Sequence, residues 1–246
     1  MSNKITTKSI RFNGGVGANV EGSQLEKRKH FIANFMGTTL DATNDWAAKV
    51  DNGTADDIAL SETAGGSVLF TTGSADNDSE MLSTAVIYNG TKKAVGTCRV
   101  GITDVSGTAL FVGFTDAKLE SNNSIAIHYP DDALTTVASD AAGFVIDADS
   151  ATLGASSLLC CGVKANSDAT TVDTGITWAD NEVKTLTVEL DGTTAKFYVD
   201  GVQKGTVANA VTAATLLCFS IQAMTRAADG SNTVRVYRVE TWVDET

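Results

Sequence analysis

Apolar and polar residues alternate along most of the chain from about residue 31 onward. Alternation over about four to eight residues, with Gly, Asp and Asn between the runs, is typical of half-buried antiparallel strands. The runs that show it cover residues 97–102, 110–114, 124–129, 143–146, 158–163, 183–190, 195–199, 216–223 and 233–243. About ten or more strands in one chain predict an all-β fold in which two antiparallel sheets pack face to face.

The most regular unit is a three-stranded meander between residues 186 and 205. Apolar residues at alternate positions give its strands a common buried face, and Asp-Gly pairs at 191–192 and 200–201 separate the strands. Glycine readily adopts the positive φ that tight hairpin turns need. We therefore expect three short strands joined by two tight turns.

The pattern is ambiguous between residues 23 and 58. Ser23 and Glu26 before an apolar stretch fit a capped helix, whereas the alternation over 31–35 fits a strand. Because everything downstream is sheet, a strand at 31–36 is the favoured interpretation. Residues 41–58 are acidic and irregular, and a short helix is one interpretation of positions 45–49.

Length and composition suit a single β-sandwich domain, since the chain has 246 residues of which 43% are apolar. Its 18 basic and 30 acidic side chains give a net charge of −12, which disfavours a nucleic-acid partner because phosphate contacts need a basic face. No window approaches the roughly 18 uninterrupted apolar residues of a membrane-spanning helix, and the N-terminus lacks the apolar core of a secretory leader. We expect a soluble protein that contacts neither nucleic acid nor membrane.

Charge is unevenly distributed along the chain. Residues 1–30 contain six basic and two acidic side chains, a charge of +4, so residues 31–246 hold 12 basic and 28 acidic ones, a charge of −16. The first thirty residues have few large apolar groups and bury too little to order themselves. We expect an extended basic N-terminal arm (1–30) that orders on a partner, followed by the sandwich domain (31–246); a terminus without a role is the alternative.

The meander, followed by long strands that reach the C-terminus, resembles concanavalin A-like jelly rolls, the superfamily of legume lectins, laminin-G modules and many glucanases. The Phe31–Phe35 run, Trp46, the segment 65–73 with Asp76-Asn77-Asp78, and the segment 109–117 also resemble bacteriophage virion proteins of this fold. The resemblance covers residues 31–246 and implies a two-sheet antiparallel jelly-roll sandwich. In such virion proteins the jelly roll decorates the capsid or forms a head or tail appendage.

Candidate catalytic residues are scarce. Retaining glucanases of this fold carry a Glu-x-Asp-x-x-Glu strand whose carboxylates act as nucleophile and acid, and no such string occurs here. The acidic segments most similar to this motif are 180–182, which fits a turn before a strand, and 189–191, in which Asp191 belongs to a hairpin turn. A nucleophilic triad would need His30 or His128 as base, and we expect His128 at a surface or rim position. The sequence therefore predicts no catalytic residue and no enzymatic activity.

Metal and cofactor sites are not indicated either. The segment 76–80 offers oxygens to calcium, but Met81 and Ile87 occupy the positions of the EF-hand glycine and closing glutamate. The four cysteines have no zinc-binding spacing and are expected to be free thiols packed as small apolar groups. On a strand, the adjacent Cys160 and Cys161 would point to opposite faces.

Carbohydrate recognition would need exposed aromatic rings with polar groups around them. Tyr198 alternates against Phe197 and Val199 and should face outward. Trp178 is a second candidate contact, although core packing is the favoured interpretation for the tryptophans.

Together these observations predict a non-enzymatic virion structural protein that decorates or cements the outer surface of a phage head, after synthesis in the host cytoplasm. Its partners would be the major capsid protein or other virion subunits, with copies of the chain forming a homo-oligomer such as a trimer. The expected capsid contacts are Arg11, Phe12, Lys27, Arg28 and Lys29. The alternative is a carbohydrate-binding module or receptor-binding adhesin that recognises surface glycans through Tyr198 and Trp178.

Overall fold

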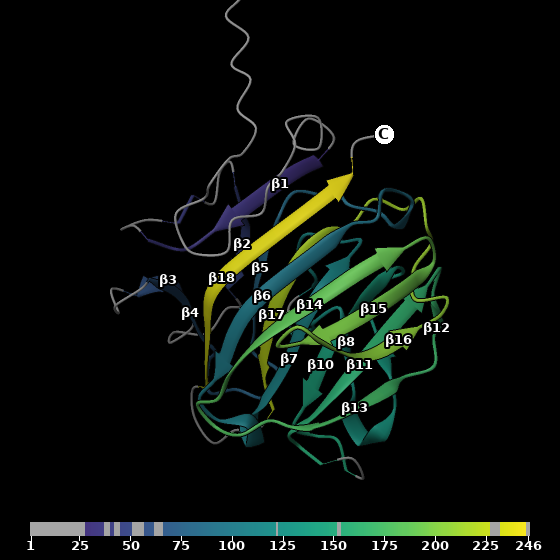
Figure 1. Ribbon diagram of the computed structural model, residues 1–246. Helices are drawn as coiled ribbons and strands as arrows, with labels where there is room; N and C mark the ends of the chain where they lie inside the picture. The colour runs from purple at the N-terminus through teal and green to yellow at the C-terminus, as the bar shows by residue number, and fades with distance from the viewer. Residues whose placement is uncertain are drawn as a thin grey trace, which may run out of the picture.

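The computed structural model describes residues 28–36, 40–41, 45–50, 57–61, 66–121, 123–151, 154–226 and 232–244. These residues form a sandwich of two eight-stranded antiparallel sheets, and the first sheet lies in front of the second in Figure 1. The predicted fold class, an all-β two-sheet antiparallel sandwich, is confirmed. No helix in the described ranges is long and apolar enough to cross a membrane.

The first sheet has the longest strand, β18, near its middle. Its strands in spatial order are β16 (Val202–Val207), β15 (Thr194–Val199), β14 (Val183–Asp191), β6 (Val95–Ile102), β18 (Thr233–Asp244), β4 (Ser67–Thr71) and β3 (Asp57–Ser61). The eighth strand, β1 (Arg28–Ala33), pairs with the C-terminal half of β18, beyond the half that pairs with β4.

The second sheet is built around β7. Its strands in spatial order are β12 (Ser167–Asp168), β11 (Ser157–Lys164), β10 (Ala141–Asp147), β7 (Thr108–Thr115), β17 (Cys218–Thr225), β5 (Ser79–Ser83) and β2 (Ala47–Val50), and β13 (Val172–Thr177) also pairs with β11. The remaining elements are a short pair, β8 (Ile127–His128) and β9 (Thr135–Thr136), and three 3-10 turns, η1 (Gly90–Lys92), η2 (Val105–Gly107) and η3 (Pro130–Asp132).

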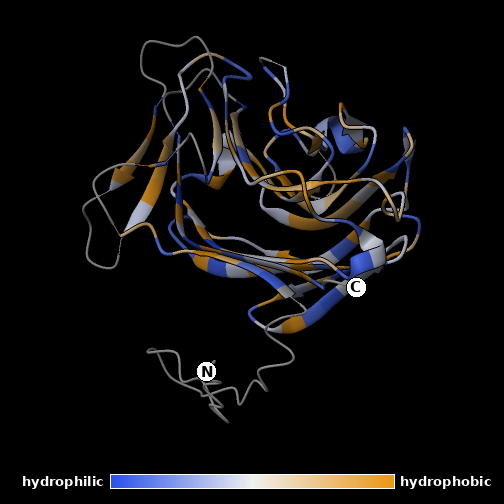
Figure 2. Cartoon of the chain, turned by 90° about the horizontal axis from the view of Figure 1, so that it is seen from above, coloured by the Kyte–Doolittle hydropathy of each residue, from blue (hydrophilic) through white to orange (hydrophobic). Residues whose placement is uncertain are grey.

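The main core lies between the two sheets, as the period-two pattern requires. Successive strand residues point to opposite faces, and Figure 2 shows hydrophobic and hydrophilic residues alternating along the strands. The rings of Phe144 on β10 and Phe197 on β15 meet edge to face across the two sheets, with centroids 5.1 Å apart, and Phe114 and Phe219 on the paired strands β7 and β17 make a similar contact at 5.2 Å within the second sheet. The inward faces of the two sheets therefore follow directly from the alternation in the sequence.

The meander forms as predicted. Strands β14, β15 and β16 pair in sequence order, and Gly192 and Gly201 have φ angles of 63° and 80° in the two turns. Cys160 belongs to the core between the sheets and Cys161 to a separate apolar cluster on the other face of the second sheet. All four cysteines are buried free thiols, as expected.

Two local predictions need correction. The prediction of a short helix near residues 45–49 is wrong, because Ala47–Val50 form β2, an edge strand paired with β5. A strand at 31–36 is confirmed in kind, but β1 begins at Arg28 and ends at Ala33. Three residues assigned to the arm, 28–30, therefore belong to the first sheet, since β18 extends far enough to pair with them through residues 242–244.

Candidate functional site

The face of the second sheet that points away from the first is covered by chain. The connection between β7 and β10, residues 116–140, includes β8 and η3, and its described residues (all except 122) pack on this face through a second apolar cluster. The buried members of that cluster are Met81, Ala109, Phe111, Ile125, Ala126, Ile127, Ala138, Ala141, Val145, Leu159, Cys161, Val163 and Met224. Burial of this apolar area stabilises the covering segment and fills the space where an open sheet would offer a groove.

A buried ion pair anchors one end of this cover. The guanidinium of Arg226, at the end of β17, donates from Nε and Nη2 to the two carboxylate oxygens of Asp147 at 2.8 and 2.6 Å. Nη1 of Arg226 donates to Asn77 Oδ1 at 2.6 Å. Asp147 also accepts the backbone N–H groups of Tyr129 and Asp149. The Arg226–Asp147 ion pair therefore connects β10, the end of β17 and two loops, and stabilises their arrangement.

His128 lies beside this pair and is half-buried. Burial, and then the charge of Arg226, lower the pKa of His128 to about 4, so the imidazole is neutral at pH 7. Its Nδ1 is buried, with no hydrogen-bond partner among the described residues. The expected surface or rim position is thus only partly realised, because β8 is part of the cover and packs against β7 and β10.

The carboxylates considered for catalysis are engaged elsewhere. Glu182 accepts the N–H of Ala179 at 3.2 Å and pairs with Lys184, while Asp180 accepts the N–H of Val105 at 2.9 Å. Glu189 pairs with Lys196 at 3.0 Å. Within the described ranges, no group of three or more His, Cys, Asp and Glu side chains could hold a metal ion.

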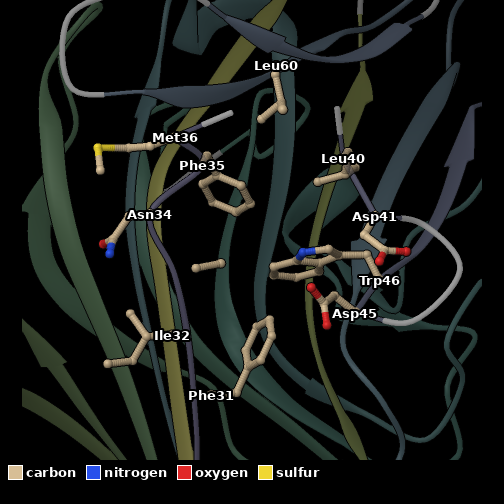
Figure 3. Close-up of a pocket in the computed structure, with 11 residues that line it drawn as sticks. Phe31, Ile32, Asn34, Phe35, Met36, Leu40, Asp41, Asp45, Trp46 and Leu60 are labelled. Carbon is tan, nitrogen blue, oxygen red and sulfur yellow. The ribbon is translucent and has the colours of Figure 1, made fainter. Parts of the chain in front are cut away.

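A pocket of about 360 Å³ lies where β1 ends. Figure 3 shows Phe31, Phe35 and Trp46 gathered at its centre, with ring centroids of Phe31 and Phe35 at 5.3 and 5.6 Å from that of Trp46. The other residues that line it are Ile32, Ala33, Asn34, Met36, Leu40, Asp41, Asp45 and Leu60. Residues from several stretches of the chain, 31–36, 40–41, 45–46 and position 60, therefore line one pocket.

The backbone of this pocket is strained at Phe35. Its φ is 51°, a left-handed conformation that bulky side chains rarely adopt. Such a conformation costs on the order of 1–3 kcal/mol and is often found at functional sites. The turn buries the Phe35 ring to 7% exposure while leaving Met36 at 79% and Ile32 at 42%. The pocket therefore combines fixed aromatic rings with exposed apolar side chains at its rim.

The predicted contact residues fall into two groups. Arg11, Phe12 and Lys27 lie outside the described residues, and the contacts predicted for them remain predictions. Arg28 and Lys29 are in β1, opposite Asp244 and Val243 of β18, so they are part of the sandwich and precede Phe31, the first pocket residue, by three and two positions. Lys29 is exposed.

The two candidate carbohydrate contacts differ in exposure. Tyr198 faces outward from β15, half-buried, and its hydroxyl donates to Glu189 Oε2 at 3.2 Å. Trp178 as a sugar contact is wrong, because the side chain is 1% exposed. Its Nε1 donates to the carbonyl of Glu182 at 2.9 Å, and Lys184 Nζ lies 5.6 Å from its ring centroid. The ring packs in the core and offers no free face.

The sequence alone did not predict that these residues form a pocket. Phe31, Phe35 and Trp46 were visible as aromatic residues in an irregular stretch, but their convergence depends on β1 pairing with β18 and β2 with β5. The nearest indication in the sequence was the cluster of large apolar residues over 31–36, directly after a basic segment.

Comparison with solved structures identifies the fold. The β-glucanase of Bacillus licheniformis is 14% identical with a TM-score of 0.57, over 88% of this chain and 98% of that one. Peanut lectin is 14% identical with a TM-score of 0.58, over 89% and 99% of the two chains. A carbohydrate esterase from the Shiga toxin-encoding bacteriophage phi24B is 15% identical with a TM-score of 0.52, over 88% and 97%.

These neighbours place the sandwich among concanavalin A-like jelly rolls, which confirms the fold that the resemblance implied. No protein-family model matches the chain, and no curated protein matches its sequence. Because the identities are 14–15%, the likeness concerns the fold.

Proposed function

We propose that the protein is a non-catalytic structural module of a larger assembly, held in place by its basic N-terminal segment and by the pocket at the end of β1. The assembly that we propose is a phage particle, with the sandwich decorating the outer surface of the head. The partners are then the major capsid protein or other virion subunits, and copies of the chain associate around a symmetry axis, for example as trimers.

The observation that carries this proposal is the position of the pocket. It opens along the strand that directly follows the basic segment, and its rim bears the exposed side chains of Ile32 and Met36. Fixed rings surrounded by exposed apolar groups are the usual centre of a protein–protein contact. One partner subunit could contact both the segment and the pocket, because they are continuous in the chain.

Two further features support a role without catalysis. The outward face of the second sheet is filled by the segment 116–140, and the carboxylates considered for catalysis are engaged in turns and ion pairs. Residues 1–30 carry a charge of +4 and residues 31–246 a charge of −16, and this contrast favours docking of the basic N-terminal segment on an acidic neighbour.

The test uses particles assembled without this protein, which are incubated with the purified chain and sedimented. We expect the full-length protein to co-sediment, and both deletion of residues 1–27 and the double variant Ile32→Asp/Met36→Asp to weaken binding by about thirtyfold, the effect of losing a hot spot of about 2 kcal/mol. Val202→Asp changes an equally exposed apolar residue on β16, at the opposite edge of the sheet, and should bind like the unchanged protein. Undiminished binding by the truncated chain would refute the tether.

A second candidate function is carbohydrate binding, which the lectin and glucanase neighbours favour. The specific observation in its support is the presence of three half-buried aromatic side chains on the outward face of the first sheet, Tyr198 on β15 and Tyr237 and Trp242 on β18. A glycan array with the full-length protein tests it; binding lost on replacing these rings with alanine would support this function.

A further inference from the structure

The outward face of the first sheet contains an irregularity in β18. The register against β6 shifts between Val236 and Arg238, so a bulge places an extra residue, Tyr237, in the strand. Tyr237 is half-buried and Arg238 is exposed, whereas their neighbours Val236 and Val239 are buried. Bulges re-aim side chains and are frequent next to functional sites. Here the bulge turns two consecutive side chains toward solvent.

Arginines are concentrated around this bulge. Three of the four arginines that follow residue 30 lie on this face, and the fourth is the buried Arg226. Arg99 and Arg238 are directly opposite each other on β6 and β18, and Arg235 is opposite Gly101 two positions along. Like charges directly opposite on neighbouring strands destabilise a sheet. Their grouping on a strongly acidic protein therefore points to an anionic ligand.

A hollow of about 250 Å³ adjoins the arginines. Arg235, Asn181 and Tyr237 contribute to its wall, together with residues 101–103 and Val183. A Cβ atom at Gly101 would lie 3.1 Å from Val183 Cγ2 and 3.2 Å from the carbonyl oxygen of Glu182, so a larger residue would be crowded at this position. The guanidinium of Arg99 lies over the Tyr237 ring, 5.1 Å from its centroid. The hollow thus offers the guanidinium of Arg235, an amide and an aromatic ring to a small ligand, and Arg99 lies next to it against that ring.

We propose that this hollow binds the anionic group of an acidic polysaccharide, with Arg235 and Arg99 as the charged contacts and Tyr237 as the ring that supports the sugar. The guanidinium fork matches a carboxylate or a sulfate ester in a bidentate geometry. Aromatic rings provide the apolar surface on which a pyranose packs. Arg238, directly opposite Arg99, donates from Nη2 to Glu240 Oε2 at 2.6 Å.

The composition of this face favours a saccharide over an acidic protein. Protein interfaces have an apolar centre, yet none of the exposed large hydrophobic residues in the described ranges lies on β6, β14 or β18. The wall of the hollow instead includes a hydroxyl-bearing residue, Thr103, whose Oγ1 donates to the carbonyl oxygen of Thr233 at 2.9 Å. The inference rests on the carbohydrate-binding candidate above and narrows its ligand to acidic saccharides.

The test measures binding of the full-length protein by titration calorimetry to three probes: a galacturonic acid trimer, a sulfated heparin disaccharide and neutral maltotriose. We expect binding to the acidic probes, weakened at high salt, and little to maltotriose. Arg235→Gln should weaken acidic binding by about tenfold or more, the effect of one charge-assisted hydrogen bond. Lys118→Gln, which removes one exposed positive charge from the segment covering the other sheet, should change affinity less than about twofold.

Several outcomes would overturn the inference. Equal affinity for maltotriose and the acidic probes would leave carbohydrate binding standing and remove the anionic specificity. A hexaglutamate peptide is titrated in the same way. If it bound more tightly than either acidic saccharide, the outward face of the first sheet would be assigned to a protein partner. Absence of binding to all probes, or an equal effect of the two variants, would refute the site, while the particle-sedimentation result would be unaffected. An unchanged unfolding midpoint shows that Arg235→Gln still folds.

Discussion

Replacing Arg226 by methionine tests whether the buried ion pair holds the cover over the second sheet. The side chains of Arg226 and Asp147 are 6% and 0% exposed, and two bonds of 2.6–2.8 Å join them. Methionine keeps the apolar length of the side chain but leaves the Asp147 carboxylate buried without its cation. Breaking a buried pair in this way costs about 3–5 kcal/mol.

For a chain of this size, about 3–5 kcal/mol corresponds to a fall of roughly 6–20 °C in the melting temperature. Urea denaturation monitored by tryptophan fluorescence measures the free energy of unfolding directly. Arg238→Met is the matched control, because its bond to Glu240 is also 2.6 Å but its side chain is 50% exposed. An exposed pair of this kind contributes about 0–1 kcal/mol.

A double variant separates the ion pair from the rest of the packing. Asp147→Asn combined with Arg226→Met removes both charges, and we expect it to be more stable than Arg226→Met alone because no uncompensated charge remains buried. If Arg226→Met cost no more than Arg238→Met, or if the double variant were the less stable of the two, burial of the pair would not be what anchors the cover.

Three further predictions concern stability and reactivity. The pKa of His128 is lowered to about 4 in the folded protein, against 6.5 in the unfolded chain. Because the unfolded chain binds the proton first as the pH falls, the free energy of unfolding decreases by about 2 kcal/mol between pH 6.5 and pH 4. His128→Gln should therefore flatten this part of a plot of unfolding midpoint against pH. Burial raises the pKa of the Cys161 and Cys218 thiols to about 12 and also raises the pKa values of Cys98 and Cys160. The folded protein should therefore resist a thiol reagent that labels all four cysteines in urea. Rapid labelling of the folded protein would contradict the burial of these thiols. Gly113→Ala would bring a Cβ atom within 2.2 Å of the Ala142 carbonyl oxygen, so the variant should be destabilised by several kcal/mol (roughly 3 or more), as circular dichroism melting would show; a melting temperature within a degree or two of the unchanged protein would rule out this close approach of β7 and β10.

The alternation of residues along the chain was enough to predict most of the strands from β6 onward and the inward-facing residues of the meander, but not β2–β5. The period of two is a local property of an extended backbone, so it assigned Cys160 and Cys161 to opposite faces and Tyr198 to the outside before any pairing was known. The Asp-Gly turns were equally local, because the positive φ they need is a property of one or two residues. The charge contrast between residues 1–30 and the rest of the chain is likewise fixed by composition alone.

Tertiary structure decided everything that depends on which strands are neighbours. The short segment 47–50 is a strand because β5 pairs with it, and Trp178 is buried because its loop packs on the core. Residues 116–140 cover a sheet face that alternation alone would leave open. Arg99 and Arg238 meet only because β6 and β18 pair across a bulge. Pairing between segments far apart in the chain is set by the packing of the whole domain, which no local pattern encodes.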